Sequence, residues 1–227
     1  MNLRIFDGVD DLLHAAARTL VQRAAASTSF SIALSGGSTP QPLYTMLGQS
    51  PLRQELSDVA ITWVVVDERY VPIDDPQSNA GMMNRTLFAE GMSLKHRFLP
   101  FLTDFPQVSR SAVEFESKWI EFGLDALDVV ILGMGDDGHT ASLFPGTTAL
   151  AVNDRIATEV FVPKLDMWRV TITKPVIRAA KLRIVLAAGA SKQPLLRALR
   201  EGADYPIAEA TSGLDTWWFV DRSAAPD

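Results

Sequence analysis

Hydrophobic residues along this chain follow two alternating patterns, one typical of helices and one typical of buried strands. In residues 9–26 the hydrophobic positions recur at spacings of three and four, which predicts an amphipathic helix. Further along the chain, short hydrophobic runs rich in β-branched residues predict strands. These runs cover residues 30–34, 61–66, 129–132, 169–173 and 182–187.

Helical patterns separate the predicted strands. They cover residues 40–47, 79–88, 109–122, 175–180 and 191–200. The strand runs are hydrophobic at nearly every position, as in sheets that helices cover on both faces, and alternating strands and helices favour parallel pairing. The sequence therefore predicts an α/β fold with a mostly parallel sheet and helices on both faces. A further run at 216–220 predicts an edge strand.

Composition and the absence of internal boundaries indicate one folded unit. The chain has 227 residues, of which 47% are hydrophobic and 21% are charged, the balance of a globular protein. It contains no repeat, charge block or Gly/Ser-rich linker. We therefore expect a single α/β domain over residues 1–227.

Charge and residue usage exclude several classes of protein. Lys and Arg total 21 against 27 Asp and Glu, a net charge of -6, so the overall field should repel nucleic acid and anionic lipid. We find no signal peptide and no hydrophobic run long enough to span a membrane. The lack of cysteine excludes disulfides and thiolate chemistry and fits the reducing cytoplasm. Because the three histidines are widely spaced, we expect no metal and no cofactor.

The segment after the first predicted strand is a candidate anion site. Ligands of open α/β sheets gather beyond the carboxyl ends of the strands, and SGGSTP lies there, directly before a helix. Its glycines allow backbone N–H groups to converge, which makes the segment either an anion cradle or a tight turn with an ordinary helix cap. The candidate residues are Ser35, Gly36, Gly37, Ser38 and Thr39.

Charged residues follow or begin other predicted strands. Asp67 and Arg69 follow the second strand, where the guanidinium is suited to hold an anionic substrate and the carboxylate to orient or exchange a proton. Arg169 begins the fourth strand and Lys192 follows the fifth. A lysine in the first turn of a helix opposes the helix dipole, which favours an anionic partner there. For each of these side chains the alternative is an ordinary solvated or paired surface charge.

The segment GMGDDGHT, after the strand at 129–132, matches the GxGxxG pattern of dinucleotide-binding loops. We reject that function because Asp136 and Asp137 would crowd the space that a pyrophosphate needs. The segment instead places His139 beside Asp137. Imidazole titrates near neutrality (pKa about 6.5), so His139 is a candidate general base, with Asp137 or Asp67 orienting it. The alternative is a structural histidine that caps the next segment.

Five motifs in this order and spacing resemble those of the 6-phosphogluconolactonase family. They are SGGSTP at 35–40, VDERYVP at 66–72 followed by SNAGMMNRTLF, GMGDDGHTASLFPG at 133–146, RVTIT at 169–173 and GASK at 189–192. Any one motif is weak evidence, whereas five in register are specific. The resemblance implies a Rossmann-like α/β fold similar to those of glucosamine-6-phosphate deaminase and ribose-5-phosphate isomerase.

The same resemblance implies hydrolysis of 6-phospho-D-glucono-1,5-lactone to 6-phospho-D-gluconate in the oxidative pentose phosphate pathway. It implies that His139 is catalytic, that Arg69 lies near the substrate, and that SGGSTP, Arg169 and Lys192 face the phosphate. We therefore expect a cytoplasmic monomer or homodimer that acts on a small sugar-phosphate lactone. The alternatives are an isomerase or deaminase of the same fold and a non-catalytic sugar-phosphate-binding protein.

Overall fold

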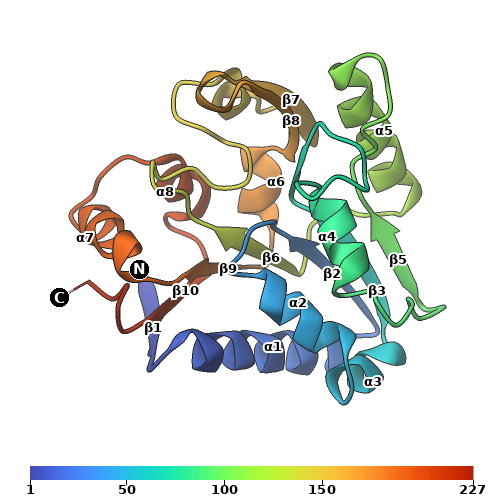
Figure 1. Cartoon of the computed structure of the whole chain (residues 1–227), viewed down its shortest axis with the longest axis horizontal. Coiled ribbons are helices and arrows are strands. Elements are labelled where there is room, and N and C mark those ends of the chain that lie inside the picture. Colours follow the sequence, from blue (N-terminus) through green and yellow to red (C-terminus); the bar gives the residue numbers. More distant parts are fainter. Residues whose placement is uncertain (227) are drawn as a thin grey trace.

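A sheet of seven parallel strands forms the centre of the molecule (Figure 1). A computed structural model describes residues 1–226, and within them the strand order of this sheet is β1-β10-β9-β6-β2-β3-β5. Every pairing in it is parallel, as the alternation of strands and helices predicts. The strands are β1 (Asn2–Phe6), β2 (Ser29–Leu34), β3 (Ala60–Val65), β5 (His96–Leu99), β6 (Val129–Gly133), β9 (Leu182–Ala187) and β10 (Thr216–Asp221).

A second, antiparallel sheet has three strands, in the order β4-β8-β7. These are β4 (Asp67–Arg69), β7 (Ala157–Val162) and β8 (Met167–Ile172). The strand predicted at 169–173 is confirmed as β8, but it pairs in this small sheet and not in the parallel one. Because β4 begins two residues after β3 ends, the small sheet is tied to the carboxyl edge of the large sheet.

Helices cover both faces of the large sheet, as predicted. Figure 1 shows α1 along one face, and α6 and α8 on the other. The helices are α1 (Val9–Ala25), α2 (Gln41–Gly48), α3 (Leu52–Ser57), α4 (Asn79–Arg85), α5 (Val108–Glu121), α6 (Lys174–Ala179), α7 (Gln193–Arg200) and α8 (Pro206–Thr211). Short 3₁₀ helices are η1 (Thr148–Ala151), η2 (Pro163–Leu165) and η3 (Ala190–Lys192). No helix within residues 1–226 has both the length and the apolar character to cross a bilayer.

The middle strands of the large sheet form the core. Ile32 on β2, Ile131 on β6 and Ile184 on β9 are fully buried, and all six residues of β9 are buried. Burying a large aliphatic side chain stabilises a fold by about 1.5–3 kcal/mol. The continuous hydrophobic runs in the sequence therefore reflect strands that are covered on both faces.

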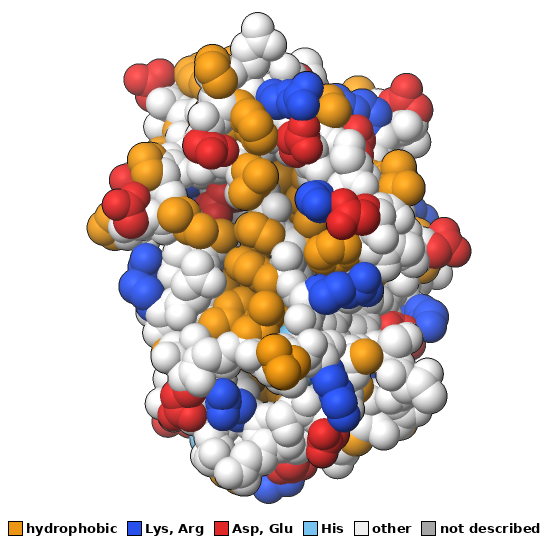
Figure 2. Space-filling model, turned by 90° about the vertical axis from the view of Figure 1, so that its right-hand side faces the viewer, with side chains coloured by type: hydrophobic (Ala, Val, Ile, Leu, Met, Phe, Trp, Pro, Cys, Tyr) orange, Lys and Arg blue, Asp and Glu red, His pale blue; other side chains and the backbone are white. Residues whose placement is uncertain are grey.

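The edges of the large sheet differ from the prediction. The expected edge strand at 216–220 is β10, and it lies between β9 and β1. The prediction was wrong because it missed β1, whose five residues are exposed or half-buried and so lack the hydrophobic run of a central strand. β5 forms the opposite edge. Figure 2, which faces that side of the molecule, shows a band of hydrophobic side chains flanked by charged ones.

The register of the large sheet brings four chain segments to one place. Leu34 pairs with Val65, and Gly133 pairs with Leu186, so β2, β3, β6 and β9 all end at the same edge. The segments that follow these strands are the ones in which the sequence places its polar motifs. A shared carboxyl edge is where α/β sheets bind ligands.

Candidate active site

A cleft of about 420 Å³ lies at this carboxyl edge. It is lined by the segments that follow β2, β3, β6 and β9, together with part of β8. The structure brings together ten of the eleven predicted site residues as lining residues: Ser35, Gly36, Gly37, Ser38, Thr39, Asp67, Arg69, His139, Arg169 and Lys192. The eleventh, Asp137, contacts His139.

The SGGSTP segment is held in a fixed turn between β2 and α2. The buried Tyr44 hydroxyl donates a hydrogen bond of 2.7 Å to the Ser35 carbonyl oxygen, and burial raises the pKa of Tyr44, so the hydroxyl stays protonated. A Cβ atom on Gly36 would lie 1.8 Å from Oδ1 of Asn79, and Gly37 has a φ of 115°. Both glycines are therefore required by the local backbone path.

Asn79, which the sequence analysis did not select, supports this side of the cleft. Its Nδ2 donates to the Asp67 carbonyl oxygen at 2.6 Å, and its Oδ1 accepts from Arg69 at 2.7 Å. Arg69 also donates to the carbonyl oxygen of Gln77 at 2.6 Å. The sequence shows Asn79 only as the start of a predicted helix, and nothing in that pattern indicates that its side chain points back to Arg69.

Glu68 has a structural role. Its buried carboxylate accepts hydrogen bonds from the backbone N–H groups of Arg69, Asn79 and Ala80, and from the Ser78 hydroxyl. Burial raises the pKa of Glu68, although these hydrogen bonds act in the opposite direction. Glu68 therefore satisfies the orphan N–H groups at the start of α4 and fixes the helix that carries Asn79.

Two arginines face each other beside the cleft. Arg69 on β4 and Arg169 on β8 are direct partners in the antiparallel register. Within residues 1–226, Nε of both arginines and Oγ of Ser35 are buried without a hydrogen-bond partner. Buried polar atoms are nearly always paired, so three unpaired ones around one cleft support this region as a candidate functional site.

Asp67 lies between the arginines and the turn that carries His139. It is 5% exposed, its Oδ2 accepts a hydrogen bond of 2.6 Å from the Ser142 hydroxyl, and the same oxygen lies 3.7 Å from Arg169. Of the two carboxylates proposed to orient the imidazole, Asp137 makes the contact and Asp67 does not. Ser142 was missed because its polar partner lies 75 residues away in the sequence.

His139 lies in a tight turn after β6. The Gly135 N–H donates to the His139 carbonyl oxygen at 2.9 Å, and the Gly138 N–H donates to the Gly135 carbonyl oxygen at 3.0 Å. A Cβ atom on Gly135 would lie 2.0 Å from Cε1 of the imidazole, so only glycine leaves room for the ring. Ala141 has a φ of 52°, a strained backbone conformation directly beside this turn.

Asp137 and Phe144 fix the imidazole of His139. Nδ1 of the ring contacts Oδ1 of Asp137, and the ring stacks on Phe144 with centroids 3.9 Å apart. Burial would raise the pKa of Asp137, but hydrogen bonds from Lys164 and His139 hold this pKa at about 2. Because this ionised carboxylate can only accept, Nδ1 must be the donor and the lone pair of a neutral ring lies on Nε2.

The protonation state of His139 suits a base. Burial lowers the pKa of His139, against the raising effect of Asp137, so the imidazole is neutral at pH 7. Its side chain is 23% exposed and lines the cleft. A neutral, oriented imidazole near Arg69 and Arg169 can remove a proton from water next to a bound anion.

Lys192 contacts the turn that carries His139. Its ammonium group pairs with Asp136, and this pairing lowers the pKa of Asp136. Asp136, which was expected to prevent pyrophosphate binding, thus pairs with a cation. The lysine side chain is 19% exposed and lines the cleft.

Comparisons with known proteins identify the family. A family model described as glucosamine-6-phosphate isomerases/6-phosphogluconolactonase matches residues 7–218. The chain belongs to this family. It is 40% identical over 211 residues to a 6-phosphogluconolactonase of Nostoc sp., covering 87% of this chain and 84% of that one. It is 32% identical over 216 residues to one from Pseudomonas putida, covering 91% and 86%.

Solved structures show the same fold. A 6-phosphogluconolactonase from Trypanosoma cruzi superimposes with a TM-score of 0.85 at 27% identity and covers 99% of this chain and 95% of that one. A monomeric glucosamine-6-phosphate deaminase superimposes with a TM-score of 0.83 at 23% identity, covering 99% and 98%. The predicted likeness to the deaminase fold is therefore confirmed.

Proposed function

We propose that this protein hydrolyses 6-phospho-D-glucono-1,5-lactone to 6-phospho-D-gluconate in the oxidative pentose phosphate pathway. The observation that carries the proposal is that one cleft is lined both by a neutral, carboxylate-bound imidazole and by three cationic side chains, those of Arg69, Arg169 and Lys192. A substrate with a phosphate at one end and a reactive carbonyl carbon at the other matches both. The relatives named above as 6-phosphogluconolactonases support the same reaction.

In this proposal the phosphate binds to the SGGSTP segment, Arg169 and Lys192. The SGGSTP segment, Arg169 and Lys192 all line the cleft. Each charge-assisted hydrogen bond to a phosphate contributes about 1.5–3 kcal/mol. Binding energy from this remote group holds the lactone carbonyl near His139, which converts attack by water into a positioned reaction.

His139 acts as the base and then as the acid. Its Nε2 removes a proton from water while the water oxygen bonds to C1 of the lactone. The tetrahedral intermediate then breaks the bond between C1 and the ring oxygen, and the imidazolium returns its proton to that oxygen. The products are a carboxylic acid, which ionises in water, and a free hydroxyl group. Asp137 stabilises the imidazolium between the two steps.

The developing oxyanion needs hydrogen-bond donors that are already in place. Two sets of groups line the cleft for this role: Arg69, whose guanidinium is held by Gln77 and Asn79, and the backbone of the glycine-rich turns. Removal of such a donor costs about 10²- to 10³-fold in kcat.

The substrate itself tests the proposed function. Wild-type protein should accelerate hydrolysis of 6-phosphogluconolactone well above the spontaneous rate, followed by acid release in a lightly buffered solution. Glucosamine 6-phosphate, tested in parallel for ammonia release, should give no turnover. Turnover of glucosamine 6-phosphate with no effect on the lactone would replace the proposal by a deaminase.

Two further expectations belong to this proposal. The lack of cysteine supports a cytoplasmic location. We also propose that the protein works as a monomer or a homodimer; the site residues of one chain are enough to form the cleft.

A further inference from the structure

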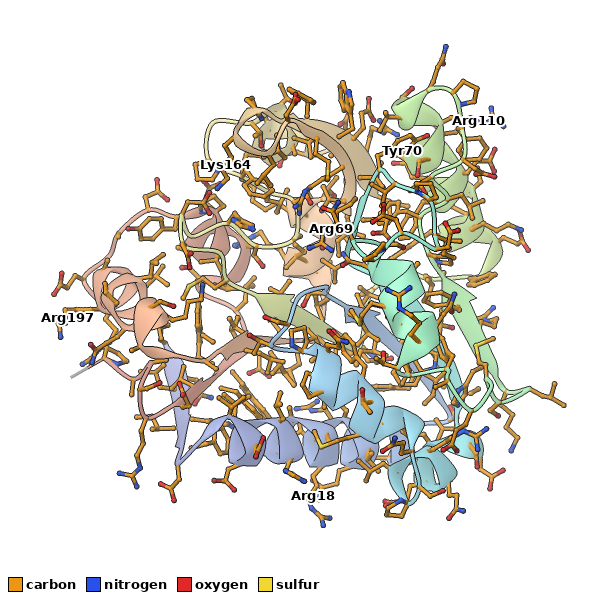
Figure 3. The ribbon with its side chains drawn as sticks, in the orientation of Figure 1. Arg18, Arg69, Tyr70, Arg110, Lys164 and Arg197 are labelled. Carbon is orange, nitrogen blue, oxygen red and sulfur yellow. The ribbon has the colours of Figure 1, made fainter. Side chains whose placement is uncertain are left out.

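Lys164 contacts the proposed catalytic pair from outside the cleft. It lies in η2, the short turn that joins β7 to β8, and Figure 3 labels it near that hairpin, with Arg69 nearer the centre of the molecule. Its ammonium group contacts Oδ2 of Asp137, while Oδ1 of the same carboxylate contacts Nδ1 of His139. The residues that line the cleft do not include Lys164. Its direct partner in the pair is Asp137.

Lys164 also lies over the aromatic ring that stacks on the imidazole. Its Nζ lies 4.8 Å from the ring centroid of Phe144, and that ring stacks on His139. The lysine thus contacts both groups that hold the imidazole, the carboxylate at its edge and the aromatic ring at its face. The side chain of Lys164 is 51% exposed, whereas that of Asp137 is 30% exposed, so the ammonium group closes the outer side of the pair.

Other charged groups surround this arrangement. Asp67 on β4 raises the pKa of His139, as Asp137 does, whereas Lys164 lowers it. Arg169 on β8 lies 5.3 Å from the Phe144 ring. Asp136, on the same turn as His139, is already paired with Lys192. Lys164 is thus the cation that directly contacts the carboxylate bound to His139.

We propose that Lys164 is a positioning residue of the proposed lactonase reaction, which holds Asp137 against His139 and adds its positive charge to the burial that keeps the imidazole neutral. The inference rests on the proposed function only for its kinetic consequence. Loss of the ammonium group would free the outer carboxylate oxygen and leave the full negative charge of Asp137 to stabilise the imidazolium. The base would then be protonated over a wider range of pH.

The variant Lys164→Met tests this, because methionine keeps an unbranched apolar side chain and removes the charge. The ratio of variant to wild-type kcat/KM should be about threefold lower at pH 6 than at pH 8, the size expected for a partly exposed charge interaction. The substrate phosphate also titrates near pH 6, but its ionisation affects both proteins equally and so does not change this ratio. Lys164→Arg should restore the wild-type profile. Lys95→Met, which removes a surface lysine paired with Asp58, should leave it unchanged.

A measurement without substrate separates this inference from the proposed function. Titration of the His139 Cε1 proton by NMR, assigned with a His139→Asn variant, should show a higher pKa in Lys164→Met than in wild type. An unchanged or lower pKa, or a variant that loses activity equally at both pH values, would overturn the role of Lys164. Failure of wild type to hydrolyse the lactone would overturn the proposed function, while the NMR result would still decide the effect of Lys164 on His139.

Discussion

Arg69 and Arg169 lie directly opposite each other on β4 and β8, an arrangement that like charges disfavour. Nε of each is buried without a partner among the described residues, and an anion bound in the cleft would relieve the repulsion between the two guanidinium groups. The sequence identifies each arginine as a candidate. It does not reveal that they are neighbours, because their pairing joins positions one hundred residues apart.

Replacement of Arg169 by methionine tests the proposed phosphate-binding site. We expect Arg169→Met to lower kcat/KM by about 10- to 150-fold, the cost of one charge-assisted hydrogen bond, mainly through a higher KM. Steady-state rates over a range of lactone concentrations provide the measurement. Arg18→Met is the matched control, because Arg18 lies on α1 and points away from the molecule in Figure 3. A normal KM in Arg169→Met would contradict the assignment.

Sequence reasoning found most of the side chains that line the cleft and, apart from Asp137, missed those that hold them in place. His139 and Asp137 are two residues apart, so a local pattern reveals them together. Lys164 reaches Asp137 from 27 residues away, and Asn79 reaches the Asp67 carbonyl oxygen from 12 residues away. Supporting contacts of this kind depend on how the small sheet and α4 pack beside the carboxyl edge, which no local pattern encodes.

At the scale of elements, the turn after β6 depends on glycine to place His139. Gly135→Ala would put a Cβ atom 2.0 Å from the imidazole, so the ring must move. Displacement of a catalytic group by about 1 Å costs about 10²-fold in rate, and we expect a loss of kcat of this size. Gly8→Ala, where a Cβ meets no atom within 4 Å, should keep wild-type kcat. Full activity of folded Gly135→Ala would show that the turn tolerates a side chain.

His96 links two strands of the large sheet to α3. Trp63 on β3 donates from Nε1 to Nδ1 of His96 on β5 at 3.3 Å, and Nε2 of the same ring lies 3.1 Å from the Leu56 carbonyl oxygen. Nδ1 must therefore be an acceptor, which requires a neutral ring. Burial lowers the pKa of His96 in the same direction.

This arrangement predicts an acid-dependent loss of stability. Because the pKa of His96 is lower in the folded than in the unfolded chain, unfolding takes up a proton below about pH 6.5, and stability falls as the pH drops through that range. The unfolding free energy, measured with urea at pH 7.5 and at pH 5.5, should differ less between the two pH values for His96→Asn than for wild type. His14→Asn, on the exposed side of α1, should keep the wild-type difference. Equal differences for all three proteins would exclude a role of His96.

For the whole molecule, the sequence pattern predicts the α/β class and the shared carboxyl edge, since continuous hydrophobic runs and polar strand ends are local signals. The placement of β1 beside β10 and the separate small sheet were not predicted. β4 has only three residues and β1 has no fully buried position, so neither shows the hydrophobic run of a central strand. Both are defined by their pairing partners.

Arg183 connects elements on the side of the fold away from the cleft residues. Its buried guanidinium donates to the carbonyl oxygens of Ile177, Arg178 and Ala180 in and after α6, and to that of Asp215 before β10. Arg183→Met would remove these charge-assisted hydrogen bonds, and we expect a loss of about 3–5 kcal/mol in unfolding free energy. At a temperature where the variant is folded, its kcat/KM should equal that of wild type. An unchanged urea midpoint would contradict this role.

The role of His139 as the base of a lactonase is tested most directly by one comparison. The measurement is the rate of 6-phosphogluconolactone hydrolysis by wild type and by His139→Asn at pH 7, corrected for spontaneous hydrolysis, with folding checked by circular dichroism. General acid–base catalysis contributes about 10²- to 10⁴-fold, so the variant should lose kcat by that factor while KM changes little. A folded variant that keeps wild-type kcat would contradict the account.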